Sequence, residues 1–178
     1  MFTKEIPIPE GIKVEVDGGK ISVAKGETKL TRDLWHPAIT IVCRDSLIEV
    51  ATASSRRKIQ ALTGTFASHI TNMIKGVDNG FEYRMKVVYA HFPVQLKVEN
   101  DLLLIENFLG ERAPRRAKIM KGVSVKIAGA DVIVTGADLE AVGQTAGNIE
   151  QATRIKRRDP RVFQDGIYIV SKSMGESS

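Results

Sequence analysis

The sequence of 178 residues contains few of the residues that most often crosslink a fold or span a membrane. Its single cysteine, Cys43, excludes a disulfide within the chain. Cys43 ends the apolar run Ile39–Cys43, so we expect it to be a buried small hydrophobe. No apolar run approaches the ~20 residues of a membrane helix, and the N-terminus has no apolar signal stretch. We therefore expect a soluble, cytoplasmic protein without a membrane partner.

Histidine is also scarce, and nothing in the sequence forms a catalytic or metal-binding pattern. His36, His69 and His91 are scattered and have no ligand partner at a known spacing. The stretch Val132–Gly143 faintly resembles a strand–glycine–helix phosphate loop but lacks the glycine spacing of nucleotide-binding motifs. Capping of a helix explains it better. We expect no enzyme activity, no metal, no cofactor and no small-molecule substrate.

Two segments of the chain share one pattern of apolar residues, which indicates an internal repeat. The first segment begins with a predicted hairpin in Ile12–Gly26, and the second begins with one in Val94–Gly110. Each continues with another hairpin, in Ile39–Ala51 and Val123–Thr135, where the apolar side recurs every second residue. In the first hairpins the matched pairs of positions are Val14 and Leu96, Val16 and Val98, Ile21 and Leu103, and Val23 and Ile105. In the second hairpins they are Ile39 and Val123, Ile41 and Val125, Cys43 and Ile127, Ile48 and Val132, and Val50 and Val134.

Helical spacing of apolar residues follows each second hairpin. The first helix is expected from about Arg57 to Ile74, with Ser54 or Ser55 as its N-cap. The second is expected from about Leu139 to Gln151, with Asp138 as its N-cap.

The second predicted helix contains Gly143 and Gly147, which lower its intrinsic helix propensity. Close packing of the helix on the sheet is the simpler explanation for these glycines. Close approach of an RNA backbone is the alternative.

These elements predict an α+β fold of two duplicated domains, each an antiparallel sheet with one helix packed on a face. We expect the domains at residues 1–80 and 81–172, with the boundary near Gly76–Gly80. The segment Phe81–Val94 is too apolar for a flexible linker and is expected to be a strand that joins the domains and partly pairs with one of them. Residues 173–178 are expected to be a disordered tail.

The net charge of +5 favours a polyanionic partner, and the distribution of the charge is more informative. The segment Thr153–Gly166 contains Asp159-Pro160, which breaks a helix and predicts a loop. Between Arg154 and Arg161, Asp159 is the one acid beside five cations, so we expect a phosphate-contacting patch in place of a merely solvated face. The cations of this segment are Arg154, Lys156, Arg157, Arg158 and Arg161.

Two further basic segments leave phosphate contact and plain solvation both open. Arg56, Arg57 and Lys58 lie at the start of the first predicted helix, where cations oppose the helix dipole. The other segment, Gly110–Gly122, joins the two hairpins of the second repeat. Its cations are Arg112, Arg115, Arg116, Lys118 and Lys121.

Aromatic residues make up only 6% of the chain. Proteins that stack single-stranded bases need exposed aromatics beside basic residues, and only Phe163 and Tyr168 lie near the main basic segment. We therefore expect a folded RNA partner that is recognised by shape and backbone more than by base stacking.

The chain resembles the ribosomal protein L-six family, in its archaeal and eukaryotic branch. Three stretches carry the resemblance: GFEYRMKVVYAHFP (Gly80–Pro93), FLGERAPRRAKI (Phe108–Ile119) and, most specifically, GQTAGNIEQATRIKRRDPRVFQDGIYIV (Gly143–Val170). It extends from about Ile6 to Lys172. One departure is Gly147, where the family pattern leads us to expect alanine. We expect this departure to weaken the helix slightly and to leave function unchanged.

The resemblance implies a structural constituent of the large ribosomal subunit, located in the cytoplasm on the ribosome. Its partners would be large-subunit rRNA, near the base of the factor-binding stalk and the sarcin–ricin loop, and neighbouring ribosomal proteins. The second domain makes most RNA contacts in this family, which points to the five cations of Thr153–Gly166 with Gln144, Asn148 and Gln151 as polar neighbours. The alternative function is that of an RNA-associated protein outside the ribosome, such as a processing factor.

Overall fold

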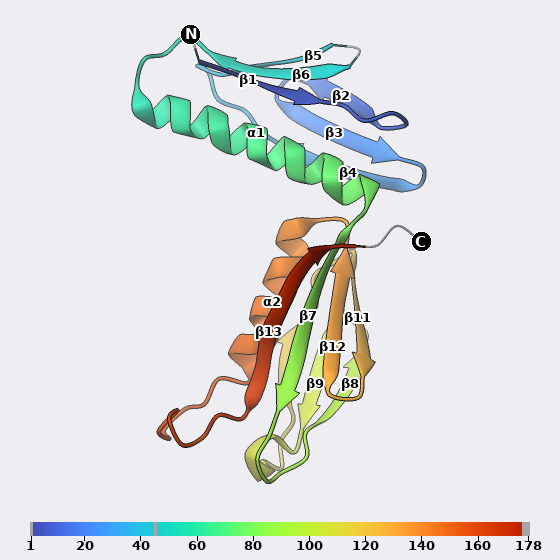
Figure 1. Ribbon diagram of the computed structural model, residues 1–178, viewed down its shortest axis with the longest axis vertical. Coiled ribbons are helices and arrows are strands. Elements are labelled where there is room, and N and C mark those ends of the chain that lie inside the picture. Colours follow the sequence, from blue (N-terminus) through green and yellow to red (C-terminus); the bar gives the residue numbers. More distant parts are fainter. Residues whose placement is uncertain (1, 45, 176–178) are drawn as a thin grey trace. The chain divides into compact units, whose positions relative to one another are not determined.

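The computed structural model describes residues 2–44 and 46–175 (Figure 1). These residues divide into two compact units, which we call unit 1, ending at Asn79, and unit 2, beginning at Gly80. Each unit has its own cluster of buried apolar side chains. Helices and antiparallel strand pairs make up both units, so the predicted α+β class is confirmed.

Unit 1 contains two three-stranded sheets and one long helix. The sheets have the strand orders β1-β6-β5 and β2-β3-β4. Helix α1 (Arg57–Asp78) packs against β1, β3, β4 and β6, and turns Phe66, Ile70 and Ile74 into the core. The strands are β1 (Phe2–Pro7), β2 (Lys13–Asp17), β3 (Lys20–Lys25), β4 (Thr28–Asp33), β5 (Thr40–Arg44) and β6 (Leu47–Thr52).

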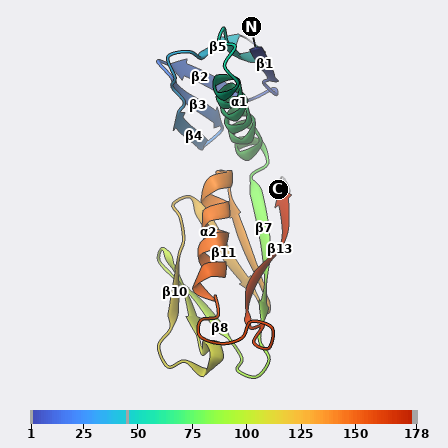
Figure 2. The same ribbon diagram turned by 90° about the vertical axis from the view of Figure 1, so that its left-hand side faces the viewer.

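Unit 2 repeats this plan with one extra strand. Its sheets have the orders β10-β9-β8 and β11-β12-β7-β13. Helix α2 (Leu139–Ala152) packs against both sheets, and Figure 2 shows it with β10 on one side and β13 on the other. The other elements are β7 (Phe81–Val88), β8 (Gln95–Glu99), β9 (Leu102–Glu106), the 3-10 turn η1 (Phe108–Gly110), β10 (Arg115–Lys118), β11 (Val123–Ala128), β12 (Asp131–Gly136) and β13 (Gly166–Met174).

The strand registers preserve the matched positions of the two predicted repeats. Val14 lies opposite Val23 as Leu96 lies opposite Ile105. In the second hairpins, Ile41 lies opposite Val50 as Val125 lies opposite Val134. Strand β1 pairs with β6 as β7 pairs with β12. The duplication is therefore confirmed, and β13, on the other side of β7, is an addition to unit 2.

The structure corrects the expectation of one sheet in each domain. The two predicted hairpins of each unit lie in separate sheets. Three of the four hairpins gain one further strand, and the hairpin of β11 and β12 gains two. Strands β4 (TKLTRD) and β10 (RRAK) were not expected because at least half of the residues in each are charged. Their pairing comes from backbone hydrogen bonds to β3 and β9, which leave little trace in an apolar pattern.

Of four local expectations, three in unit 1 are wrong and one in unit 2 is confirmed. Helix α1 continues to Asp78, four residues past the expected end, and its N-cap is Arg56 without a capping side chain, in place of Ser54 or Ser55. Asp138 does cap α2 as predicted, since its side chain accepts a hydrogen bond from Glu140 N. Cys43 is exposed, contrary to expectation, because β5 is an edge strand whose side chains are mostly exposed.

The segment Phe81–Val94 is only partly a strand. Its first part, β7, lies between β12 and β13 in the sheet of unit 2, so it is a central strand there. The expectation of disorder from residue 173 is wrong for Ser173 and Met174, which end β13, and Gly175 N donates to Gly80 O at 3.0 Å. Residues 176–178 of the expected tail lie outside the described residues.

Candidate nucleic-acid interface

Residues 153–165 form the connection between α2 and β13, which we call the basic loop. Its first residue, Thr153, is buried, and its Oγ1 accepts a hydrogen bond from Ile167 N at 3.0 Å. The same hydroxyl lies 3.1 Å from Glu150 O, to which it can donate. At the other end, buried Asp165 accepts a hydrogen bond from Ala90 N at 3.4 Å. The loop is thus tied to the sheet and helix at both ends.

The middle of the basic loop is a turn organised by Asp159. Its carboxylate accepts hydrogen bonds from Arg161 N at 2.9 Å and from Arg161 Nη2 at 3.1 Å. These bonds, first the side-chain one, lower the pKa of Asp159. Val162 N and Phe163 N donate to Asp159 O. Because the Arg161 side chain remains 89% exposed, this surface ion pair leaves its charge open to a partner.

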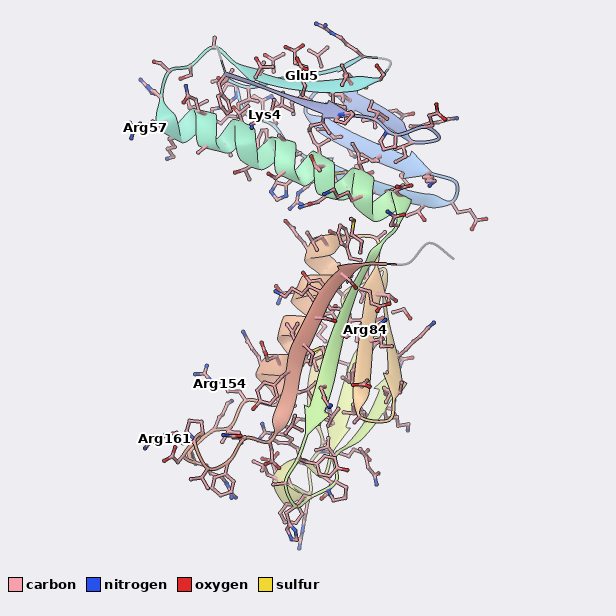
Figure 3. All side chains as sticks on the ribbon, viewed as in Figure 1. Lys4, Glu5, Arg57, Arg84, Arg154 and Arg161 are labelled. Carbon is pink, nitrogen blue, oxygen red and sulfur yellow. The ribbon has the colours of Figure 1, made fainter. Side chains whose placement is uncertain are left out.

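Three cations of the basic loop, Arg154, Lys156 and Arg157, are exposed and make no ion pair or side-chain hydrogen bond with another described residue. Arg157 adopts a left-handed backbone conformation with φ of 59°. The Arg158 guanidinium lies 4.8 Å from the centre of the Phe163 ring. Figure 3 shows Arg154 and Arg161 projecting from the loop away from the sheet. The loop therefore gathers positive charge that its own fold does not neutralise.

Arg115 differs from the other predicted cations because its guanidinium donates hydrogen bonds to backbone carbonyls near the end of α2. Its Nη1 donates to Ala152 O and Arg154 O, both at 3.0 Å, and its Nε and Nη2 donate to the Glu111 carboxylate. The guanidinium also lies 4.3 Å from the centre of the Phe108 ring. The Arg115 hydrogen bond lowers the pKa of Glu111, against a smaller opposing effect of burial.

These contacts use most of the donors of Arg115 inside the protein. They satisfy carbonyls at the end of α2, where a cation also suits the helix dipole. This geometry argues for a positioning role of Arg115, in place of the phosphate contact or plain solvation that the sequence left open.

A polar face of α2 adjoins β10. Gln144, Asn148 and Gln151 share this face at helical spacing. Gln144 Nε2 donates to Asn148 Oδ1 at 2.8 Å, and Asn148 Nδ2 donates to Lys118 O at 2.9 Å. The structure thus brings Gln144, Asn148 and Lys118 together. The side chains of Arg116 and Lys118 are exposed on either side of buried Ala117.

Arg112 and Lys121 lie apart from this group. Both are exposed outside β10, and the contacts found in the described ranges do not join them to the basic loop. The Arg56–Lys58 cluster belongs to unit 1, where it is exposed at the start of α1.

The glycines of α2 are not required by packing. A Cβ at Gly147 would meet no atom within 4 Å, and one at Gly143 would meet the Tyr83 ring only at ordinary contact distances near 3.8 Å. Close packing on the sheet, the simpler expectation, is therefore wrong for Gly147. A side chain at this position would point into open space.

A pocket of about 410 Å³ opens beside the basic loop, between the end of α2 and the start of β13. Phe163, Tyr168, Gln151 and Arg154 are among the residues that line it. Both aromatic residues lie near the basic segment in the sequence, but no sequence pattern indicates a pocket between them. The anchors Thr153 and Asp165 were also not predicted, because their partners lie far along the chain.

The described residues support neither a metal site nor a membrane-spanning helix. Within the described ranges, no three histidine, cysteine or acidic side chains gather as metal ligands would. None of the helices described is both long and apolar enough to cross a membrane.

Comparison with known proteins gives one consistent result. A family model described as Ribosomal protein L6 matches residues 8–80 and 92–166, one segment in each repeat. The relative from Methanospirillum hungatei, named Large ribosomal subunit protein uL6, is 50% identical over 168 residues, which cover 94% of this chain and 96% of that protein.

Two further relatives with the same name agree. The protein of Methanococcus vannielii is 48% identical over 173 residues, covering 97% of this chain and 95% of its own length. That of Methanosarcina mazei is 49% identical over 172 residues, covering 97% and 98%. The resemblance noted in the sequence is confirmed, and so is the expectation of a structural protein that is not an enzyme. This chain belongs to the ribosomal protein L6 family.

Proposed function

We propose that this chain is a structural component of the large ribosomal subunit and that unit 2 binds large-subunit rRNA through the basic loop and the polar face of α2. The relatives named as large-subunit proteins support the assembly. The binding proposal rests on one observation. The basic loop is anchored at both ends and presents three cations without an acidic partner among the described residues, Arg154, Lys156 and Arg157. Following the family resemblance, the proposed location is near the stalk base and the sarcin–ricin loop, beside neighbouring ribosomal proteins.

Phosphate groups are the ligands that suit the basic loop. Screening limits the reach of a surface charge to about 8–10 Å at physiological salt, so cations act together only when they are close. The cations from Arg154 to Arg161 share one short loop. Because both ends of the loop are tied, less conformational entropy is lost when RNA binds than for a free loop.

The polar face of α2 supplies a second kind of contact. Gln144, Asn148 and Gln151 carry amides that can donate and accept hydrogen bonds, as ribose 2′-hydroxyls and phosphates require. Arg116 and Lys118 extend the basic surface along β10, while Arg115 holds the loop in position.

Unit 1 lacks the corresponding loop. Helix α1 is followed directly by β7 of unit 2, whereas α2 is followed by the basic loop and β13. We therefore assign most of the rRNA affinity to unit 2. Unit 1 positions unit 2 or contacts neighbouring proteins.

The assembly proposal predicts where the chain sediments. In a sucrose gradient at stringent salt, the chain should migrate in near-stoichiometric amount with mature large subunits. A processing factor would instead be found free or only with precursor particles. A chain found free or only with precursor particles would reject the assignment to the ribosome and favour a processing factor.

The phosphate proposal predicts a change in salt dependence. The double variant K156Q/R157Q should weaken binding to refolded large-subunit rRNA and flatten the log–log salt slope by roughly 0.7–0.9 per lost phosphate contact. The matched control K13Q/K20Q removes the same charge from exposed strand positions of unit 1 and should leave the slope unchanged. Equal slopes for both double variants would show that the loop cations face solvent.

Gly147 predicts a gain in stability without a change in binding. G147A should stabilise unit 2 by roughly 0.8–1 kcal/mol, since alanine favours a helix over glycine and the added Cβ has open space. Binding to rRNA should stay the same, because the family pattern leads us to expect alanine at this position. Thermal unfolding and filter binding measure the two effects. Weaker binding by a more stable variant would show instead that the RNA backbone packs closely against residue 147.

A further inference from the structure

The pocket beside the basic loop has a lining that phosphate binding does not explain. It encloses about 410 Å³ and is walled by Phe163 and Tyr168, with Pro160 and Ile155 as further apolar surface. Glu150 also lines it. A carboxylate repels a phosphate but accepts hydrogen bonds from the amino and imino groups of a nucleobase. The lining therefore favours a flat, mostly apolar ligand with N–H groups at its edge.

The two aromatic walls are held in place before any ligand binds. The Tyr168 hydroxyl donates to Gln164 O at 2.9 Å, and the Tyr168 ring lies over Gly166, where a Cβ would come within 3.1 Å of it. Phe163 is half-buried, and its ring carries the Arg158 guanidinium at 4.8 Å. Ordered rings at the edge of a basic loop are the surfaces on which unstacked RNA bases pack.

The polar residues of the pocket fit the remaining parts of a nucleotide. Gln151 and Glu150, at the end of α2, can bond the edge of a base as donor and acceptor. Arg154 is exposed at the same pocket and has no side-chain partner in the described part of the chain, so it can take the phosphate of that nucleotide. The apolar lining with a few convergent polar groups is typical of a small-ligand site.

We propose that the pocket formed by Gln151, Arg154, Phe163 and Tyr168 receives one unstacked nucleobase of the bound rRNA. The inference rests on the proposed function and deepens it, because it adds recognition of a base to contact with the backbone. It is compatible with the expectation, drawn from the low aromatic content, that shape and backbone matter more than base stacking, because only one base is stacked.

The test uses the full chain and refolded large-subunit rRNA, with F163L and Y168L measured separately. Loss of stacking on one base should weaken binding by roughly 5- to 150-fold, with the salt slope unchanged because no phosphate contact is lost. Y168F keeps the ring and should retain most of the affinity. V162A is the matched control, since Val162 is 73% exposed in the same loop and does not line the pocket.

Chemical probing of the rRNA bases supplies a second readout. The parent chain and V162A should protect one base from modification, and F163L and Y168L should expose it again. The inference is overturned if both leucine variants, folded as judged by thermal unfolding, bind and protect like V162A. It is also overturned if they flatten the salt slope, which indicates a phosphate contact. After either result, the proposed function still stands if the parent chain binds the rRNA. If the parent chain does not bind the rRNA, both the proposed function and the base pocket are rejected.

Discussion

The candidate interface depends on the fastening of the chain at the end of α2. Arg115, from β10, donates to the carbonyls of Ala152 and Arg154, and Thr153 between them accepts a hydrogen bond from Ile167 of β13. These bonds join β10, α2 and β13 at one point. Like charges along the basic loop repel one another, so a loop without such fastening would spread and its cations would act separately. The basic loop leaves α2 at this point. The bonds therefore fix the start of the segment that contains Arg154, the turn at Asp159 and part of the pocket wall.

The duplicated architecture explains where the interface lies. Both units build the same two sheets and helix from matched apolar positions, and this common part forms the cores. Unit 2 differs by β13, which returns from α2 to pair with β7. That return requires a connection across the end of the helix, and the connection is the basic loop. The proposed binding surface is thus a loop added to a repeated and rigid scaffold, which is where binding residues are often found.

Local patterns in the sequence predicted much of this fold. The period-two alternation of Val14, Val16, Ile21 and Val23 and its copy in unit 2 gave the hairpins and their register, and Asp138 marked the start of α2. Contacts between distant residues were not predictable in this way. Arg115 reads as one more cation in GERAPRRAKIMKG, because its partners at the end of α2 lie 37 and 39 residues later. Cys43 alternates like a core residue, but β5 is an edge strand.

Directed hydroxyl-radical probing with iron tethered to a cysteine tests most directly whether the basic loop of unit 2 lies against rRNA. The natural chain offers one exposed site in unit 1, Cys43. The variant C43S/V162C moves the iron to exposed Val162 in the basic loop. The account predicts strong, localised cleavage of large-subunit rRNA from residue 162 and weaker cleavage from residue 43. Strong cleavage from residue 43 with none from residue 162 would contradict it.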